Sequence, residues 1–289
     1  MERFLLLAPA LILFTTIVVT LVVFAGLSAA GRTPRLSSVK HNQLFGAFFG
    51  RYIAWLLGPI ERALLGRVSP NAVTTVSLLM CALTGVAAAL GKLPAAVWLY
   101  AFAGILDVLD GRLARLQNKQ TASGALFDSV SDRWGELFAL TGYAWYLHDS
   151  PWMLAAVLVL GSSMMVSYTR ARAESLNIKL TGGVMQRAER VTLCALGTLI
   201  AAWCNVDADS AATVTTIVGG TLLLCGVAST ATALGRWVHA FRELSKRDHE
   251  ALAAQPADDS APHPLQAPLS AQPITSSHAY KASSAITGA

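Results

Sequence analysis

Long hydrophobic runs dominate the pattern of this chain and predict that most of it forms membrane-spanning helices. A helix needs about 20 predominantly apolar residues to cross a bilayer, and the sequence offers seven stretches of that kind. Gly, Ala, Ser and Thr occur in all of them, as close packing of helices in lipid requires. Since backbone groups in lipid must bond within their own segment, the pattern predicts an all-α integral membrane protein. The predicted spans are residues 4–27, 71–91, 93–115, 124–147, 151–174, 187–204 and 211–240.

Composition agrees with a membrane protein, and the distribution of charge predicts its orientation. Hydrophobic residues make up 54% of the chain and charged residues 13%, against about 45–50% and 25% in soluble domains. Lys and Arg fall in every second connection between the spans, which the positive-inside rule places in the cytoplasm. The net charge of +5 therefore mainly reflects topology, and no nucleic-acid-binding motif accompanies it. The basic segments are residues 31–69, 112–119, 170–190 and 236–247, and the turns near residues 92, 149 and 207 carry almost no Lys or Arg.

The cysteines carry no sign of a metal site or a disulfide framework. Cys81, Cys194, Cys204 and Cys225 lie singly in or at the ends of apolar spans, without the spacing of zinc ligands. We interpret them as small, buried, apolar side chains.

The chain divides into four predicted parts. Residues 1–30 form an extra N-terminal transmembrane helix, because their apolar core is longer than the ~7–15 residues of a signal peptide. The alternative, a signal peptide cleaved after Ala29-Ala30-Gly31, stays open. Residues 31–68 are a cytoplasmic linker with a surface helix, residues 69–247 are a membrane domain of six predicted helices, and residues 248–289 are a disordered tail rich in Ala, Pro and Ser.

The segment before the first core span alternates bulky apolar residues with charged ones. Over residues 41–67 this pattern predicts an amphipathic helix on the membrane surface, broken at Gly58-Pro59. The helix either clamps the cytoplasmic face of the bundle or is a plain linker. Ser69 is the predicted N-cap of the next helix, and Pro70 is its predicted first residue.

Four aspartates interrupt some of the most apolar sequence. Asp107 and Asp110 are i,i+3 neighbours at the end of one predicted helix, and Asp128 and Asp132 are i,i+4 neighbours near the start of the next, for which Ser123 is the predicted N-cap. A charge at membrane depth costs several kcal/mol unless it is paired, metal-bound or hydrated. Carboxylate ligands without His or Cys favour hard cations, Mg²⁺ first and then Mn²⁺ or Ca²⁺.

Two alternatives compete for these carboxylates. They form either salt bridges with Arg112, Arg115 and Arg133 or a cytoplasmic metal site that holds one or two ions for phosphoryl chemistry. Gly111 and Gly124 favour the metal site, because a residue without a side chain lets a ligand approach the backbone. Arg115 then offers a fork of donors for a phosphate.

At this point the residues resemble a known family. Asp107-x2-Asp110-Gly111-x2-Ala114-Arg115-x8-Gly124-x3-Asp128-x3-Asp132 is similar to the signature of the CDP-alcohol phosphatidyltransferases, and Pro70-Asn71-x2-Thr74 resembles the start of their first core helix. The resemblance implies a six-helix enzyme that moves a phosphatidyl group from CDP-diacylglycerol to an alcohol with release of CMP, in phospholipid synthesis at a bacterial inner or cell membrane. It implies two Mg²⁺ or Mn²⁺ ions and, in many members, a homodimer. It further implies that Asp107, Asp110, Asp128 and Asp132 bind metal, that Asp132 is also the catalytic base, and that Asn71, Thr74, Gly111, Ala114, Arg115 and Gly124 line the CDP pocket.

A second basic cluster bears on the acceptor alcohol. This cluster holds more arginines than the positive-inside rule requires, and clustered guanidinium groups suit an acceptor that carries its own phosphate. A single arginine in the cluster could instead extend its side chain so that its charge lies at the membrane surface. The stretch resembles the phosphatidylinositol-phosphate synthases, which commonly have Lys at the position of Arg170. Glycerol-3-phosphate also fits an arginine pocket, so a phosphatidylglycerophosphate synthase is the alternative, and a serine acceptor fits less well. The implied acceptor residues are Ser167, Arg170, Arg172, Arg190 and Arg236, and Arg187 belongs to the same basic cluster.

Two other classes of membrane protein also use intramembrane carboxylates. A divalent-cation transporter would place them near the midplane, often in repeated halves, whereas here they cluster near a cytoplasmic loop and no repeat is visible. A membrane prenyltransferase also binds Mg²⁺-pyrophosphate, but its sites resemble Asn-Asp-x-x-Asp repeats. The sequence therefore favours the transferase.

Overall fold

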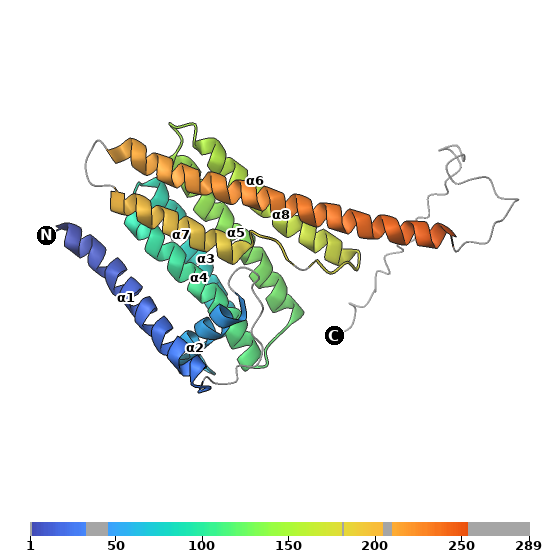
Figure 1. Cartoon of the computed structure of the whole chain (residues 1–289), viewed down its shortest axis with the longest axis horizontal. Helices are drawn as coiled ribbons and strands as arrows, with labels where there is room; N and C mark the ends of the chain where they lie inside the picture. The colour runs from blue at the N-terminus through green and yellow to red at the C-terminus, as the bar shows by residue number, and fades with distance from the viewer. Residues whose placement is uncertain (1, 33–45, 181, 205–209, 254–289) are drawn as a thin grey trace, which may run out of the picture. The chain divides into compact units, whose positions relative to one another are not determined.

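The computed structural model describes residues 2–32, 46–180, 182–204 and 210–253, and within them the protein is entirely helical (Figure 1). The chain divides into two compact units, residues 1–243 and residues 244–289. The first unit contains the bundle described below, and of the second only the last turns of one helix are described. The helices are α1 (Glu2–Ala29), α2 (Gly46–Leu64), α3 (Pro70–Ala89), α4 (Leu93–Leu116), α5 (Ala122–Tyr146), α6 (Met153–Ser175), α7 (Arg187–Cys204) and α8 (Ala211–Ala253).

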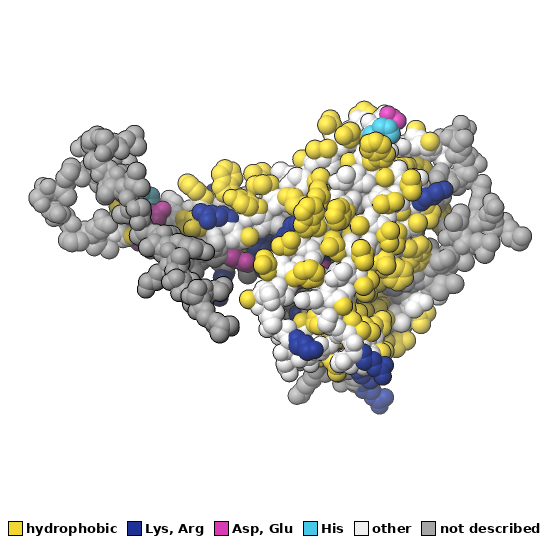
Figure 2. Space-filling view, turned by 180° about the vertical axis from the view of Figure 1, so that it is seen from behind, with side chains coloured by type: hydrophobic (Ala, Val, Ile, Leu, Met, Phe, Trp, Pro, Cys, Tyr) yellow, Lys and Arg dark blue, Asp and Glu magenta, His cyan; other side chains and the backbone are white. Residues whose placement is uncertain are grey.

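Four of the described helices are long and apolar enough to cross a membrane: α3, α4, α6 and α8. Helices α5 and α7 fall outside this group, and both carry charged residues that belong to the site described below. Figure 2 shows hydrophobic side chains spread over one face of the helical bundle, which suits contact with lipid. The all-α prediction is confirmed, and the count of six membrane-spanning core helices stays a prediction.

Close approach of backbones sets the packing of α3 against α5. A Cβ atom added at Gly142 would lie 2.0 Å from the carbonyl oxygen of Gly85, and one added at Gly85 would lie 2.2 Å from that of Phe138. The two helices run in the same direction, because Cys81, one turn before Gly85 in α3, meets Gly135, which also precedes Phe138 and Gly142 in α5. Their first turns therefore meet as well, and this brings Asn71 near the start of α5.

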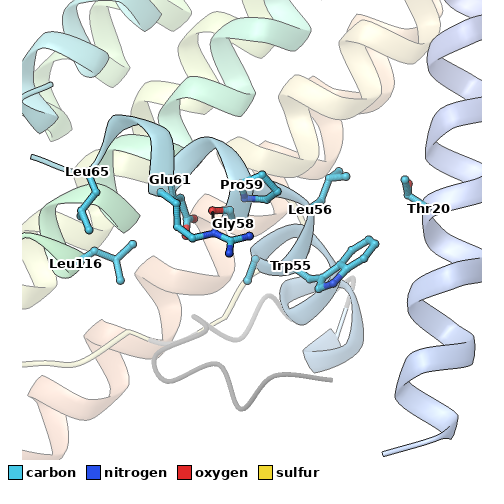
Figure 3. A pocket seen from close by; sticks show the side chains of 10 residues that line it. Thr20, Trp55, Leu56, Gly58, Pro59, Glu61, Leu65 and Leu116 are labelled. Carbon is cyan, nitrogen blue, oxygen red and sulfur yellow. Dashed lines mark hydrogen bonds between the residues drawn. The ribbon is translucent and has the colours of Figure 1, made fainter. Parts of the chain in front are cut away.

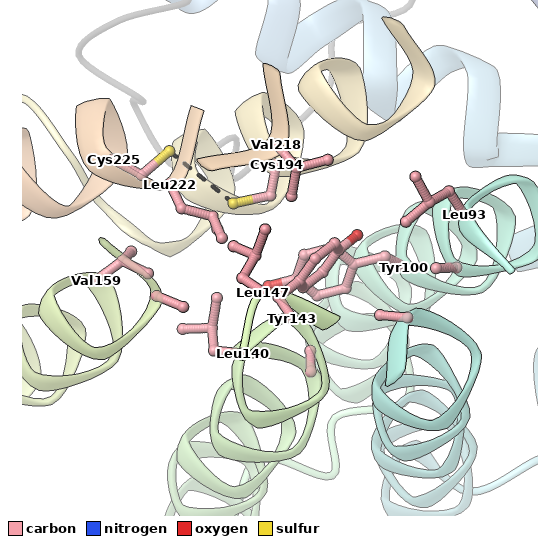
Figure 4. Packing of buried hydrophobic residues seen from close by; sticks show 14 of the residues in the cluster. Leu93, Tyr100, Leu140, Tyr143, Leu147, Val159, Cys194, Val218, Leu222 and Cys225 are labelled. Carbon is pink, nitrogen blue, oxygen red and sulfur yellow. Dashed lines mark hydrogen bonds between the residues drawn. The ribbon is translucent and has the colours of Figure 1, made fainter. Parts of the chain in front are cut away.

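The hydrophobic core fills the bundle around two buried tyrosines. Tyr100 of α4 and Tyr143 of α5 pack among buried residues of α3, α6, α7 and α8 (Figure 4). The Tyr143 hydroxyl pairs with that of Thr198 at 2.9 Å, which satisfies a polar group in the core. Leu93 and Leu147 belong to this core and lie at the ends of α4 and α5 that are remote from the aspartates.

The cysteines behave as the sequence predicts. Cys81, Cys194 and Cys225 are buried, Cys204 is half-buried, and all are free thiols. The sulfur atoms of Cys194 and Cys225 are 3.9 Å apart, which joins α7 to α8 by a weak contact.

Helix starts test the capping predictions. Ser69 caps α3 by accepting a hydrogen bond from Ala72 N at 3.2 Å, and Pro70 is the first helical residue, so both predictions are confirmed. The prediction for α5 is wrong: its N-cap is Thr121, whose hydroxyl accepts from Gly124 N at 3.0 Å. The helix begins at Ala122, which places Ser123 inside the first turn, where it can no longer cap.

Two predicted boundaries differ from the structure. Helix α2 continues through Gly58-Pro59, because a proline on an exposed helix face removes only one backbone hydrogen bond; residues 41–45 of the predicted amphipathic helix lie outside the described residues. Helix α8 continues to Ala253, so residues 248–253 are helical where the sequence predicts a tail, and residues 254–289 are not described.

Helix α2 connects the extra N-terminal helix to the bundle. Glu61 of α2 forms an ion pair with Arg112 of α4. On its other side, Tyr52 shares a 2.7 Å hydrogen bond with Thr20 of α1, and the buried Phe24 of α1 contacts the ring of Trp55. A cavity of about 630 Å³ is lined mainly by α2, with Thr20 of α1 and Leu116 of α4 also in its wall (Figure 3).

Candidate metal and nucleotide site

Three carboxylates from two helices converge at one end of the bundle. Asp107 and Asp110 lie in the last turns of α4, and Asp128 lies in the second turn of α5. One oxygen from each lies within 4.8 Å of the other two. Asp110 is buried and the other two are half-buried. Oxygen-only donors at this spacing fit a hard divalent cation, which binds carboxylate oxygens at about 2.0–2.6 Å.

Thr74 of α3 fixes the orientation of the most buried carboxylate. Its hydroxyl donates a hydrogen bond of 2.7 Å to Asp110 Oδ2, and the two residues are 5% and 3% exposed. Because α3 and α4 also pack closely along their length, with Ser77 donating to the Ala103 carbonyl at 2.9 Å, this contact is rigidly held. The second oxygen of Asp110 therefore points to a defined place, as metal ligands held by outer partners do.

A pocket of about 180 Å³ adjoins the carboxylates, and all the residues that the resemblance assigns to CDP line it. The first turns of α3 and α5 and the last turns of α4 form its walls. A Cβ atom at Gly124 would lie 3.0 Å from Thr121 Oγ1 and 3.7 Å from Asn71 Oδ1, so a side chain there would enter the pocket. The lining contains Asn71, Thr74, Gly111, Ala114, Arg115 and Gly124 together with Asp110, Asp128, Lys119 and Gln120.

Lys119 is a pocket residue that sequence reasoning did not single out. It follows α4 and lines the pocket beside Arg115. The sequence analysis counted it only as a cytoplasmic charge. Its position between the two aspartate-bearing helices is the signal that could have identified it as a pocket residue able to attract a phosphate.

Asp132 does not join the three-carboxylate group in this structure. Its Oδ1 lies 2.7 Å from a terminal nitrogen (NH1) of Arg187 on α7, and the same nitrogen forms an ion pair with Asp107. Asp107 and Asp132 thus form salt bridges with Arg187, and Arg112 and Arg133 have other partners. Arg112 binds Glu61, and Arg133 donates to the Ser129 carbonyl of its own helix.

The predicted acceptor residues are spread over three helices around the loop between α6 and α7. Arg190 is buried and paired with Glu136 of α5, with its Nε 3.0 Å from the carboxylate. Arg236 of α8 donates to the carbonyls of Gly182 and Val166 at 2.8 and 2.9 Å. These two arginines already have protein partners, so they hold the loop and α6 in place.

The remaining acceptor candidates are more exposed. Arg170 forms a 2.9 Å ion pair with Glu174 on the surface of α6, and Arg172 lies 3.5 Å from the Ser175 hydroxyl. Arg170 and Arg190 both lie close enough to Arg236 for their positive charges to repel it. These three guanidinium groups therefore share one region. Ser167 lines a separate groove of about 500 Å³ between α5 and α6.

Glu136 was missed by the sequence analysis, although the pattern contains it. Asp128, Asp132 and Glu136 occupy successive i+4 positions of α5, so one stripe of acids faces α4 and α7. The first acid belongs to the carboxylate group, the second binds Arg187 and the third binds Arg190.

Comparison with known proteins agrees with this geometry. The model of the CDP-alcohol phosphatidyltransferase family matches residues 67–240. An archaetidylinositol phosphate synthase of Methanothermobacter thermautotrophicus is 36% identical over 127 residues, which cover 44% of this chain and 64% of that protein. A phosphatidylinositol phosphate synthase of Corynebacterium glutamicum is 32% identical over 151 residues, or 49% of this chain and 68% of that one.

Solved structures of the same class share the fold. The phosphatidylinositol phosphate synthase of Mycobacterium tuberculosis with CDP-DAG bound superposes with a TM-score of 0.57 at 27% identity, covering 65% of this chain and 94% of that chain. The same protein in complex with manganese and citrate gives a TM-score of 0.56 at 28% identity, covering 63% and 87%. Helix α1 lies outside the region that the family model matches.

Proposed function

The chain belongs to the CDP-alcohol phosphatidyltransferase family, and from this premise we propose that it transfers the phosphatidyl group of CDP-diacylglycerol to a polar alcohol and releases CMP. The observation that carries the proposal is the convergence of Asp107, Asp110 and Asp128 beside a pocket lined by the nucleotide-binding residues of the motif. We assign this activity to residues 69–247.

The residues divide the reaction between them. The pocket walls, including Asn71 and Arg115, hold the cytidine monophosphate part of the substrate, and the three aspartates hold Mg²⁺ or Mn²⁺, with Asp132 completing a site for two ions. Bound divalent ions neutralise the charge that develops on the diphosphate as CMP leaves. The acceptor oxygen then bonds to the phosphatidyl phosphorus while the bond from phosphorus to the CMP oxygen breaks.

Asp132 is the proposed general base for the acceptor hydroxyl. It sits one turn after Asp128 on α5, so the proton that it removes comes from an alcohol held beside the metal ligands. A positioned carboxylate of this kind typically contributes ~10²–10⁴-fold to the rate. Its Oδ1 lies 2.7 Å from a terminal nitrogen of Arg187, a contact that holds the carboxylate in place for the acceptor.

We infer that the acceptor is an inositol phosphate. The support is the region shared by Arg170, Arg190 and Arg236 and the relatives that are phosphatidylinositol phosphate synthases. Arg172 and Ser167 lie on the same helix as Arg170, where Ser167 lines the groove between α5 and α6. Glycerol-3-phosphate carries the same phosphate group and is the alternative acceptor. The Lys and Arg distribution supports a site at the cytoplasmic face. We propose that the protein lies in an inner or cell membrane, and we expect a homodimer among membrane lipids.

The decisive experiment is an acceptor panel. Purified protein is incubated with CDP-diacylglycerol, Mg²⁺ and inositol phosphate, glycerol-3-phosphate, inositol or serine, and both CMP and the lipid product are measured by mass spectrometry. We expect CMP with inositol phosphate and a loss of at least ~10²-fold in Asp132→Asn.

The possible outcomes separate the alternatives. Faster turnover with glycerol-3-phosphate would replace the inferred acceptor and keep the reaction. No CMP with any acceptor, with Asp132→Asn indistinguishable from the parent, would refute the transferase. Metal flux into proteoliposomes under those conditions would favour a cation transporter instead.

A further inference from the structure

One guanidinium group lies where the proposed metal site and the proposed base meet. Arg187 is the first residue of α7, and its terminal nitrogen is shared by Asp107 of α4 and Asp132 of α5. Its side chain is 19% exposed, and the two carboxylates are 28% and 21% exposed. One cation thus ties together three helices that carry the site.

Asp107 has two candidate partners of positive charge. It is a member of the carboxylate group that fits a divalent ion, and it is also a partner of Arg187. A divalent ion at the group and the guanidinium beside it carry charges of the same sign. In a partly buried site such charges repel strongly, because little water screens them.

The arginine is not fully satisfied where it lies. Its Nε is buried and has no hydrogen-bond partner among the described residues. Around its terminal nitrogens stand Asp107, Asp132 and, further off, Glu136, and the backbone of Gly135 leaves space beside NH2. A buried donor without an acceptor is unfavourable, so this position lacks the full set of contacts expected of a purely structural arginine.

We propose that Arg187 is a positioning residue that acts as the internal counter-cation of the site. Without a divalent ion it holds Asp107 and Asp132 together. A divalent ion bound at the carboxylate group would neutralise Asp107 in place of the guanidinium, while Arg187 would keep the Asp132 carboxylate in place beside the metal site and the acceptor. This inference rests on the proposed function, but its main consequence concerns metal affinity and needs no turnover.

The consequence has a definite sign. Removal of the positive charge at position 187 takes away a competitor for Asp107 and a source of repulsion, so the protein should bind a divalent ion more tightly. Loss of a structural arginine alone would loosen the site and weaken binding. Couplings between neighbouring sites usually amount to about 5–150-fold, and we expect about tenfold here.

The test is a Mn²⁺ titration of the purified full-length protein, followed by the electron paramagnetic resonance signal of free Mn²⁺. Arg187→Gln should bind Mn²⁺ about tenfold more tightly than the parent, and Arg187→Lys, which keeps the charge, should return toward the parent value. Arg62→Gln is the matched control: it removes the same charge from an exposed residue of α2 whose Nε donates to the Gly58 carbonyl at 3.2 Å, outside the carboxylate group, so its Mn²⁺ affinity should not change.

Stability and kinetics give further readouts. Arg187→Gln should melt below the parent in EDTA, and saturating Mn²⁺ should close most of that gap, because the ion then neutralises Asp107. Its kcat should fall while the KM for CDP-diacylglycerol changes little, since the disturbed group is Asp132.

Several results would overturn the inference. Mn²⁺ binding to Arg187→Gln that equals or is weaker than that of the parent would refute competition for Asp107. Equally tight binding by Arg187→Lys and Arg187→Gln would show that charge is not the cause. A parent protein that binds no Mn²⁺ would refute the metal site itself, whereas normal Mn²⁺ behaviour without CMP release would leave the role of Arg187 intact and refute only the transferase.

Discussion

Removal of the Thr74 hydroxyl should weaken metal binding by one to two orders of magnitude. Thr74→Val keeps the shape of the side chain but removes the donor that lies 2.7 Å from Asp110 Oδ2. Both residues are buried, so water cannot take the place of the lost donor. Asp110 then loses the contact that fixes its orientation toward Asp107 and Asp128.

The magnitude follows from the nature of this hydrogen bond. A hydrogen bond to a charged group contributes about 1.5–3 kcal/mol, and loss of the partner that orients a metal ligand typically costs 10–100-fold in affinity or activity. Both estimates agree, because about 1.4 kcal/mol corresponds to a factor of ten. We therefore expect the Mn²⁺ dissociation constant to rise 10–100-fold.

Thr75→Val is the matched control for this experiment. Thr75 is the next residue, is exposed, and donates only to the Asn71 carbonyl of its own helix at 2.9 Å. The assay is Mn²⁺ titration of both variants, followed by CMP release at saturating Mn²⁺, where Thr74→Val should recover much of its rate. Equal Mn²⁺ affinities for the two variants would refute the orienting role of Thr74.

Three further predictions test the scaffold and the metal requirement. Gly142→Ala places a Cβ atom 2.0 Å from the Gly85 carbonyl, so we expect the free energy of unfolding to fall by about 1–3 kcal/mol. The control Gly161→Ala meets nothing within 4 Å and should be neutral. Equal melting temperatures for the two variants would contradict the close contact of α3 and α5. Glu61→Gln leaves Arg112 without its ion-pair partner and should destabilise the attachment of α2 by about 3 kcal/mol. The measurement is amide hydrogen exchange, which should become faster in α2. Unchanged exchange would mean that other contacts hold this helix. Chelation with EDTA should abolish CMP release and added Mn²⁺ should restore it, so turnover that persists in EDTA would exclude a metal-dependent mechanism.

Sequence periodicity was enough to predict the local part of the site. Asp107 and Asp110 lie on one face of α4, because residues three apart share a helix face. Asp128 lies opposite them on α5, the next helix in the chain. Proline and serine at the start of α3 likewise act within one turn, and that helix begins where the sequence predicts. Hydropathy predicted the all-α class, because backbone groups in lipid leave few alternatives.

Some local features still depended on detail that the pattern lacks. Two hydroxyl residues, Thr121 and Ser123, could each cap α5, and the choice depends on where the chain leaves the preceding turn. The break predicted at Pro59 did not occur, because α2 retains its other hydrogen bonds and packs against α4.

The sequence alone determined which carboxylates lie on which helix face and that they need positive charge to balance them. Only the tertiary structure decided which cations supply that charge: Arg187 binds Asp107 and Asp132 across 80 and 55 positions of chain, and Arg190 binds Glu136 across 54. No helical period relates residues so far apart. The partner of a buried charge is set by how closely the helices approach, and α7 packs closely on α4, where a Cβ atom added at Gly104 would lie 3.1 Å from the Val191 side chain.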